Sequence, residues 1–527
     1  MKIRSLPLTL LPALVVAISP VAAADPAFSG AKPNIVFVFS DDHGAQAIGA
    51  YGAKWGVDAT PCIDKLAAQG MRFDHCFCGN SLCGPSRATV LTGKFSHANG
   101  YAQNDGQAPF DGGQPTLPKY LHQAGYETAI FGKWHLESNP TGFDAWKVLV
   151  GQGVYYNPVF ITPEGRQQVK GYVSDITADM ALDWLSHQHD PKKPFLLMIH
   201  QKAPHRNWFP GPQEMALWKG TKFPEPANLF DDYSGRGPGA AHQEMEIDRH
   251  MHMDSDLHIG KSLAKPTLEP PGLTPEEQKL WHEAYDDENN AFIENPPTGK
   301  DLVHWKYQRY IMDYLRCAKG VDRNLGRVMD YLDEHGLKEN TVVIYSSDQG
   351  FFLGEHGWFD KRWIYEESLR MPFIIRWPGH IQAGSVQESM IQNTDFMPTF
   401  LELAGVKQPE DIHGKSIVPL LEGKSENLHE AAYYHYYEKK EHNVPKHTGV
   451  RTDRYTLAWF YAEQPAYWEL FDREKDPSEM KSVYDDPAYA KVRDELTAQL
   501  KSLAAKYGDH TPPWGDEAPK YSGPKMD

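Results

Sequence analysis

The sequence predicts an α/β fold in which helices flank a mostly parallel central sheet. A smaller C-terminal α+β domain with an antiparallel sheet is expected to follow. Four apolar runs have the length of strands that are buried on both faces of a sheet. Helical patterns separate these runs, and strands that alternate with helices form parallel sheets. Beyond about residue 425, short aromatic strands and one amphipathic helix replace this pattern.

The four predicted strands of the large sheet lie at 34–40, 128–131, 195–199 and 341–347. Helices are expected between them, including 176–185 and 310–332. Each strand is followed by charged or polar residues, namely Asp41, Asp42, Lys133, His135, Lys202, His205, Asp348 and Gln349. Ligands of open α/β sheets bind beyond the carboxyl ends of the strands. The sequence therefore predicts one site, at one edge of the sheet.

The remaining chain divides into segments with different patterns. We expect a signal peptide at 1–24, a large domain at 32–425 and a C-terminal α+β subdomain with a tail at 426–527. Within the large domain, about 210–305 is rich in Pro, Gly and His, which predicts a loop-rich insertion. The C-terminal part is expected to contain strands at 431–437 and 455–461, and then a helix. The apolar face of that helix would carry Val492, Leu496, Leu500 and Leu503.

Composition and targeting signals restrict the function. The 527 residues carry a formal net charge of −17, which disfavours general binding to nucleic acid or to anionic membranes. Lys2 and Arg4 precede an apolar run at 6–18 that is too short to span a membrane, and small residues follow at 21–23. The first cysteine after this segment is Cys62, so no lipid anchor is expected. We predict export to the periplasm or the extracellular space, without a membrane anchor.

Cys83 opens a helical pattern in the segment Cys83-Gly-Pro-Ser-Arg87. Pro85 suits the first turn of a helix, so Cys83 is expected near a helix N-terminus, where the free N–H groups favour an anion. The alternative is a buried or disulfide-bonded cysteine, and Cys76 and Cys78 are candidates for pairing. The spacing alone does not decide between these two interpretations.

The wider pattern resembles that of the type I, formylglycine-dependent sulfatases of the alkaline-phosphatase-like superfamily. The family signature Cys-x-Pro-Ser-Arg, followed by Leu-Thr-Gly, is present at 83–93. Further matching segments run in order along the mature chain, at 41–42, 132–135, 202–205, 347–350, 354–357, 361, 468–472 and 476–477. The resemblance implies a large α/β domain and a small C-terminal one, which agrees with the organisation predicted above.

The resemblance also implies a reaction. A separate maturing enzyme would convert Cys83 to formylglycine (3-oxoalanine), whose hydrate attacks the sulfur of a sulfate ester. Arg87 and Lys133 would stabilise the hydrate, and Lys133 with Lys361 would neutralise the sulfate oxygens. His135 would act as a base, and His205 would protonate the leaving alcohol.

A metal site is implied as well. Asp41, Asp42, Asp348 and Gln349 would hold one divalent cation together with the modified residue 83. Three carboxylates and an amide oxygen suit calcium, which prefers oxygen ligands. Many relatives carry Asn where this chain has Gln349, and the longer amide still supplies an oxygen.

The expected substrate is a sulfated carbohydrate. The segments 151–158, 200–208 and 442–451 look similar to those of exported bacterial carbohydrate sulfatases, especially N-acetylglucosamine-6-sulfatases that act in glycosaminoglycan degradation. Lys202 and His356 are expected to support substrate binding. His442, His447 and Arg451 are expected to line the opening of the site and contact the sugar; alternatively, they only fasten the small domain to the large one.

Three other functions stay open at this stage. One is a phosphonate or phosphodiester hydrolase of the same superfamily, and another is a sulfatase that acts on an algal polysaccharide. The third is a sugar-binding protein on an inactive sulfatase frame. The complete set of catalytic residue types argues against the third, because a binding protein does not need it.

Overall fold

The computed structural model describes residues 32–104, 107–438 and 441–511. The predicted signal peptide, and the tail from 512 onwards, lie outside the described residues. Within the described ranges, we find no helix that combines the length and the apolar character needed to cross a membrane.

The large domain is built on a ten-stranded sheet. Its strands, from one edge to the other, are β15 (Ser385–Gln387), β2 (Met71–Phe73), β14 (Phe373–Arg376), β11 (Thr341–Ser347), β1 (Asn34–Ser40), β8 (Phe195–His200), β4 (Glu127–Gly132), β5 (Ala145–Leu149), β6 (Val159–Thr162) and β7 (Gly165–Gln168). The five central strands, from β11 to β5, run parallel, and antiparallel pairs flank them on both sides. The predicted α/β fold is confirmed.

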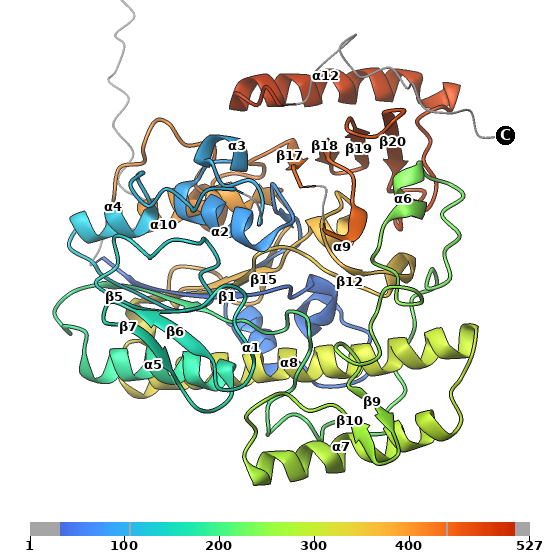
Figure 1. Ribbon diagram of the computed structural model, residues 1–527. Helices are drawn as coiled ribbons and strands as arrows, with labels where there is room; N and C mark the ends of the chain where they lie inside the picture. Colours follow the sequence, from blue (N-terminus) through green and yellow to red (C-terminus); the bar gives the residue numbers. More distant parts are fainter. Residues whose placement is uncertain (1–31, 105–106, 439–440, 512–527) are drawn as a thin grey trace, which may run out of the picture.

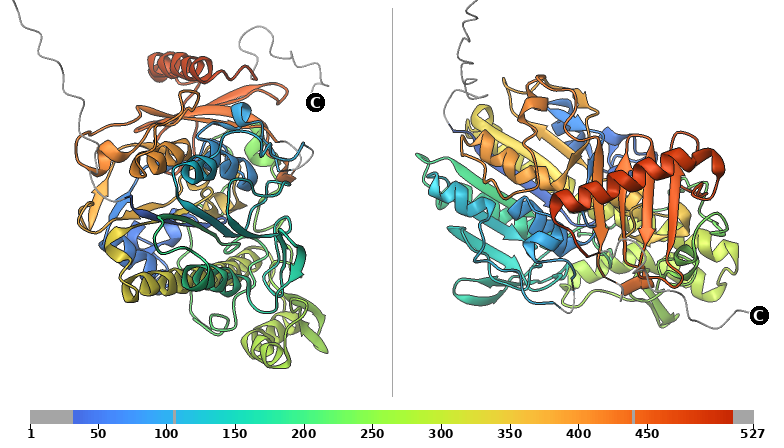
Figure 2. Two further views of the ribbon diagram at one scale, coloured as in Figure 1. Left: turned by 90° about the vertical axis from the view of Figure 1, so that its left-hand side faces the viewer. Right: turned by 90° about the horizontal axis from the view of Figure 1, so that it is seen from above.

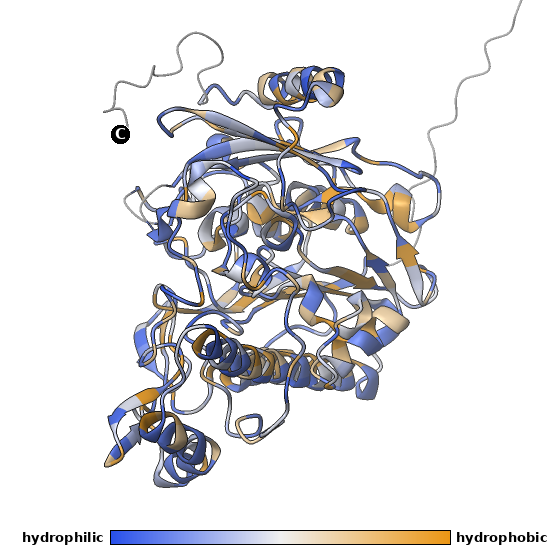
Figure 3. Ribbon diagram, turned by 90° about the vertical axis from the view of Figure 1, so that its right-hand side faces the viewer, coloured by the Kyte–Doolittle hydropathy of each residue, from blue (hydrophilic) through white to orange (hydrophobic). Residues whose placement is uncertain are grey.

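Helices cover both faces of this sheet (Figure 1). α1 (Pro61–Ala68), α5 (Val173–His187) and α8 (Lys300–Glu334) lie on one face, and α2 (Cys83–Thr92), α4 (Leu117–Gln123) and α10 (Phe396–Leu403) lie on the other. Strand β1 is apolar throughout because Ile35, Phe37 and Phe39 pack into one core, whereas Val36 and Val38 pack into the other. Figure 3 shows hydrophobic residues along the central strands.

The C-terminal part is a separate antiparallel sheet. Its strands pair in chain order: β17 (Ala431–Tyr436), β18 (His447–Thr452), β19 (Tyr455–Phe460) and β20 (Tyr467–Asp472). Helix α12 (Ala490–Tyr507) covers the outer face of this sheet (Figure 2), where Leu496 and Leu500 pack against Val450 and Leu457. The inner face packs on the large domain, in the same core as α2 and α10.

The insertion has more secondary structure than the sequence predicts. It contains α6 (Pro238–His242), β9 (Ile259–Ser262), β10 (Lys265–Thr267) and α7 (Pro275–Glu294), and α8 already begins at Lys300. The expectation of a loop-rich segment is therefore wrong for α7. This helix is mostly polar and buries little more than Trp281, Ala284 and Tyr285, so its apolar period is weak. A capping box formed by Thr274 and Glu277 marks its start.

Short elements complete the two domains. They are β3 (Cys76–Phe77), β12 (Phe352–Leu353), β13 (Phe359–Asp360), β16 (Ile391–Gln392), α3 (Ser96–Asn99), α9 (Glu366–Leu369) and α11 (Val418–Leu421). Of these, β13 matters most for function, because it ends directly before Lys361.

Candidate functional site

Polar residues from four parallel strands meet at one edge of the large sheet. Asp41 and Asp42 follow β1, Lys133 follows β4, and Asp348 follows β11. These strands and β8 are neighbours with aligned registers, so their carboxyl ends lie side by side. The strand topology therefore places these residues close together, as the sequence predicts.

Three buried carboxylates form the centre of the site. Oxygen atoms of Asp41, Asp42 and Asp348 all lie within 4.8 Å of one another. Burial and the neighbouring carboxylates raise the pKa values of Asp42 and Asp348. Asp41 differs: although burial opposes it, Lys133 and Arg87 hold its pKa well below the usual value. Crowded anions in a buried place favour a bound cation.

The oxygens available at this centre fit a hard divalent cation. Asp41 Oδ1 and Gln349 Oε1 are buried without a hydrogen-bond partner among the described residues. The amide nitrogen of Gln349 donates to Asp42, and the backbone N–H of Asp42 donates to Asp348 Oδ1 at 3.1 Å. These acidic groups can therefore hold a metal ion.

Three cationic side chains surround the carboxylates. Arg87 donates to Asp348 Oδ2 through Nη2 at 2.8 Å, and its guanidinium also lies 3.8 Å from Asp41. Lys361 Nζ contacts both oxygens of Asp42, at 2.6 and 2.7 Å. Lys133 pairs with Asp41 and is fully buried. This arrangement fixes positive charge where the oxygens of an anionic substrate would lie.

Cys83 is the first residue of α2 and is fully buried beside this cluster. Its sulfur lies within 4.8 Å of a carboxylate oxygen of Asp41 and a ring nitrogen of His205. Burial and then Asp41 raise the pKa of the Cys83 thiol well above its usual value, so the unmodified thiol is protonated and a weak nucleophile. All five cysteines are free, so the structure does not adopt the disulfide alternative.

Two histidines, His135 and His205, also belong to the candidate site. His135 is 7% exposed and adopts a positive φ of 54°. His205 Nε2 lies 3.8 Å from Asp42 Oδ2. Burial lowers the pKa values of both imidazoles well below the usual value, and Lys133 adds to this effect. Both are therefore neutral at pH 7 in the free protein.

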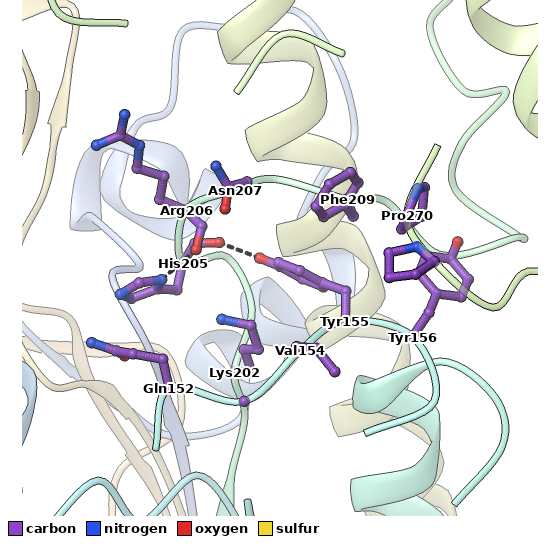
Figure 4. Close-up of a pocket in the computed structure, with 12 residues that line it drawn as sticks. Gln152, Val154, Tyr155, Tyr156, Lys202, His205, Arg206, Asn207, Phe209 and Pro270 are labelled. Atoms are coloured by element: carbon purple, nitrogen blue, oxygen red, sulfur yellow. Dashed lines mark hydrogen bonds between the residues drawn. The ribbon is translucent and has the colours of Figure 1, made fainter. Parts of the chain in front are cut away.

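A pocket of about 420 Å³ opens beside His205 (Figure 4). The segments 152–156 and 202–209 form most of its wall, and Pro270 and Pro271 from the insertion complete it. The hydroxyl of Tyr155 donates to the backbone oxygen of His205 at 2.5 Å, which joins the two segments. Lys202 Nζ lies 5.0 Å from the centre of the Tyr155 ring, and burial followed by Lys133 lowers the pKa of Lys202 to about 8.

Of the five predicted substrate residues, Lys202 lines this pocket, whereas His356, His442, His447 and Arg451 do not. His356 is fully buried and bonds to Asp231 and Arg236 of the insertion. His447 is fully buried too: its Nε2 accepts from the backbone N–H of Ile364 at 3.1 Å. These positions correct the expectation that His447 lines the opening of the site. His356, which the sequence predicts to support substrate binding, bonds to the insertion and does not line the pocket.

Arg451 has a similar place. It is 2% exposed, bonds to Glu366 at 3.0 Å and lies over the ring of Phe77. The alternative interpretation, that this stretch fastens the small domain to the large one, describes both His447 and Arg451. Here too the structure corrects the expectation of a sugar contact.

His442 lies closer to the site. Its Nε2 is 3.4 Å from Asp360 Oδ2, and Asp360 directly precedes Lys361. Its Nδ1 lies 2.8 Å from the backbone oxygen of Glu244 in the insertion. Arg362, on the other side of Lys361, pairs with Asp360 and with Glu441. This charged group therefore links the C-terminal domain and the insertion to the edge of the site.

Sequence reasoning missed several residues of the site. Gln152 accepts a hydrogen bond from Lys133 at 2.5 Å, whereas the sequence marks its segment, 151–158, only by similarity to carbohydrate sulfatases. Asp256 is fully buried in the insertion and accepts from Arg206 Nε and Nη2 at 2.7 Å and from Asn207 at 2.8 Å. No local pattern marks Asp256, because its partners lie about fifty positions away.

Comparison with known protein families decides the relationship. A family model described as Sulfatase matches residues 33–406, which is more than half of the chain. The chain belongs to the sulfatase family. A second model, described as the C-terminal part of N-sulphoglucosamine sulphohydrolase, matches residues 354–506. The protein is thus a sulfatase, a hydrolase of sulfate esters.

Characterised relatives support this assignment. The sulfatase is 46% identical to an N-acetylglucosamine-6-O-sulfatase of Bacteroides thetaiotaomicron, over 97% of this chain and 93% of the relative. It is 26% identical to an ulvan-active sulfatase of Formosa agariphila, over 91% and 82% of the two chains. A solved structure of a relative in complex with its substrate D-glucosamine-2-N,6-O-disulfate matches with a TM-score of 0.87 at 45% identity, covering 91% of this chain and 99% of that one.

Proposed function

We propose that this sulfatase removes 6-O-sulfate groups from glucosamine residues of sulfated glycans, within glycosaminoglycan degradation. The observation that carries the proposal is the 46% identity, over nearly the whole chain, to a relative named for that activity. The substrate bound in the similar solved structure is a glucosamine with a 6-O-sulfate. A pocket of about 420 Å³ beside His205 suits one sugar of this size.

In this proposal, the buried cationic side chains bind the sulfate group of the substrate. Lys133 and Lys361 neutralise its oxygens, and Arg87 holds the hydroxyls of residue 83 in place. Formylglycine at position 83 supplies the nucleophile that attacks sulfur. The protonated thiol of unmodified Cys83 supports the need for that modification, because a buried neutral thiol is a poor nucleophile.

The proposed metal ligands are Asp41, Asp42, Asp348, Gln349 and residue 83. We propose calcium, because the donor set consists of oxygens and the site holds three carboxylates. A bound divalent cation would supply positive charge at the attacking oxygen. Asp41 Oδ1 and Gln349 Oε1 accept no hydrogen bond from the described residues, which supports this assignment, since buried acceptors without a hydrogen bond are rare.

The two histidines have opposite roles. His135 is neutral and its Nδ1 has no partner among the described residues, so it can accept a proton from residue 83. His205 lies at the pocket and is placed to protonate the departing sugar oxygen. The negative charge of a bound sulfate ester raises the pKa of nearby imidazoles, which favours the protonated form that a general acid needs.

The pocket walls select the sugar. We propose Lys202 as a direct sugar ligand there, with Tyr155 beneath it. We also propose that His442, which pairs with Asp360 next to Lys361, contacts the sugar from the C-terminal domain. We further propose domain limits at 32–425 and 426–527, export through a signal peptide, and a separate enzyme that matures Cys83.

The test is sulfate release by matured protein from a panel of position-defined sulfated sugars. We expect glucosamine 6-sulfates to exceed 2-, 3- and 4-sulfated sugars by at least tenfold in kcat/KM. Preference for another position, or for an algal disaccharide, would refute the substrate assignment. Faster hydrolysis of an aryl phosphodiester than of an aryl sulfate would instead favour a phosphonate or phosphodiester hydrolase.

A further inference from the structure

A second hollow adjoins the pocket beside His205. It has a volume of about 800 Å³ and shares Val154, Tyr156 and Pro271 with that pocket. The two hollows are therefore adjacent, and together their linings extend from His205 to the residues between β7 and the start of α7. We call the second one the outer hollow. Both volumes lie in the range of ligand sites, roughly 300–1,000 Å³.

The outer hollow has walls that hydrogen bonds hold together. Asn157 Nδ2 donates to the backbone oxygen of Gly272 at 2.6 Å, which joins the large domain to the insertion. Asn157 Oδ1 accepts from the backbone N–H of Gly171 at 2.9 Å. On the far side, Glu277 caps α7 by accepting from the backbone N–H of Thr274 at 2.8 Å. The hollow is therefore formed by the chain itself before any ligand binds.

Its chemistry suits an anionic sugar. Lys170 lines the hollow, is exposed, and has no ion-pair or hydrogen-bond partner among the described residues. The carboxylate on the opposite wall, Glu277, accepts a hydrogen bond at the helix cap and keeps its negative charge, so an anionic group must bind on the Lys170 side of the hollow. Val154 is 54% exposed at the junction of the two hollows and offers an apolar surface to the C–H face of a sugar ring. Gln168 and Thr274 add polar side chains to the lining.

We propose that the outer hollow holds the next sugar of an anionic glycan chain, with Lys170 contacting its carboxylate or sulfate group. This inference rests on the proposed function, because a neighbouring sugar is present only when the sulfate ester at His205 belongs to a glycan. The sulfated sugar would occupy the pocket, and the chain would continue past Val154. The enzyme would then prefer an oligosaccharide over the same sulfated monosaccharide.

The experiment compares three probes with matured protein. They are glucosamine 6-sulfate and two disaccharides of it with a uronic acid, attached at the anomeric carbon or at O4. We expect at least one disaccharide to exceed the monosaccharide about fivefold in kcat/KM. Lys170→Ala should remove about threefold of that gain, as expected for an exposed ion pair, and Lys170→Glu should remove all of it. Added salt should reduce the gain in the wild type.

The control variant is Lys192→Glu, which makes the same charge change at an exposed lysine just before the amino end of β8. It should leave all three rates unchanged, and the Lys170 variants should leave the monosaccharide rate unchanged. If neither disaccharide exceeds the monosaccharide, or if the gain survives Lys170→Glu, the inference is wrong. If none of the three probes releases sulfate, the proposed function fails instead.

Discussion

Replacing His447 by Gln tests whether this residue joins the two domains or recognises the sugar. The imidazole is fully buried, with Nε2 accepting from Ile364 and Nδ1 donating to the backbone oxygen of Pro445 at 2.8 Å. Its ring stacks on Phe460 with 4.7 Å between centroids. The bond from Ile364 requires an unprotonated Nε2 and hence a neutral ring, and burial lowers the pKa of His447 to about 3. A glutamine side chain at this position would keep an amide in the same place but would neither stack nor titrate.

The size of the effect depends on pH. At pH 7.5 we expect the variant to lose about 2 kcal/mol of unfolding free energy, from one aromatic contact and one weakened hydrogen bond. Below pH 6.5 the unfolded histidine takes up a proton and the folded one does not, so the wild type loses stability as the pH falls towards 3. At pH 5 that loss is about 2 kcal/mol, since one pKa unit corresponds to about 1.36 kcal/mol. The two proteins should therefore become nearly equal in stability.

Urea unfolding followed by tryptophan fluorescence at pH 7.5 and pH 5 measures this difference. His187→Gln is the control, because its side chain is 73% exposed on α5, and it should change little at either pH. A gap between wild type and His447→Gln that is equal at both pH values would refute the reasoning. Normal stability of the variant together with a selective loss of sugar hydrolysis would also refute it, and would support the interpretation that His447 recognises the sugar.

Three further substitutions test the site. Cys83→Ala should abolish sulfate release and leave the melting temperature nearly unchanged. Mass spectrometry of the active wild type should find an aldehyde at position 83. Activity with an intact thiol would contradict the role of residue 83 as formylglycine. Asp348→Ala should lose the metal and the activity together, and chelation of the wild type should lower its melting temperature, because a ligand that binds only the folded state stabilises it. Unchanged melting after chelation would count against the metal site. Asp256→Asn should weaken the hydrogen bonds from Arg206 and Asn207 and lower kcat/KM on the sulfated sugar about tenfold, which corresponds to about 1.4 kcal/mol. A small aryl sulfate should be hydrolysed at the normal rate. Equal losses on both substrates would indicate a general structural defect.

The central strands and the residues after them could be predicted because burial on both faces leaves a mark in the sequence. Val36 and Val38 pack on one side of β1 and Phe37 on the other, so the strand shows as one apolar run that ends at Asp41. In a parallel sheet, strand ends then lie together whatever their distance along the chain. The cluster of carboxylates, lysines and histidines follows from that rule and from the family resemblance.

The small domain shows where such reasoning stops. Apolar and polar residues are mixed along β18, so the sequence pattern does not indicate which face of this strand packs on the large domain. Val450 packs under α12. His447 and Arg451 lie an odd number of residues away from it along the strand, so they face the large domain. The role of Asp256 could not be predicted either, because it depends on contacts between distant segments.

The pairing of β1 with β11 sets an order of events during synthesis. Asn34 pairs with Thr341, so the centre of the large sheet cannot close until more than half of the chain has been made. Until then Cys83 has no Asp348 cluster to be buried against, although in the finished fold it is fully enclosed. At about 5–20 residues per second, the ribosome needs roughly 10–50 s to pass from position 83 to position 348. The maturing enzyme that we propose for this cysteine would have that interval, and the time before folding is complete, in which to act. A chain that folded first would then stay inactive for as long as it remained folded.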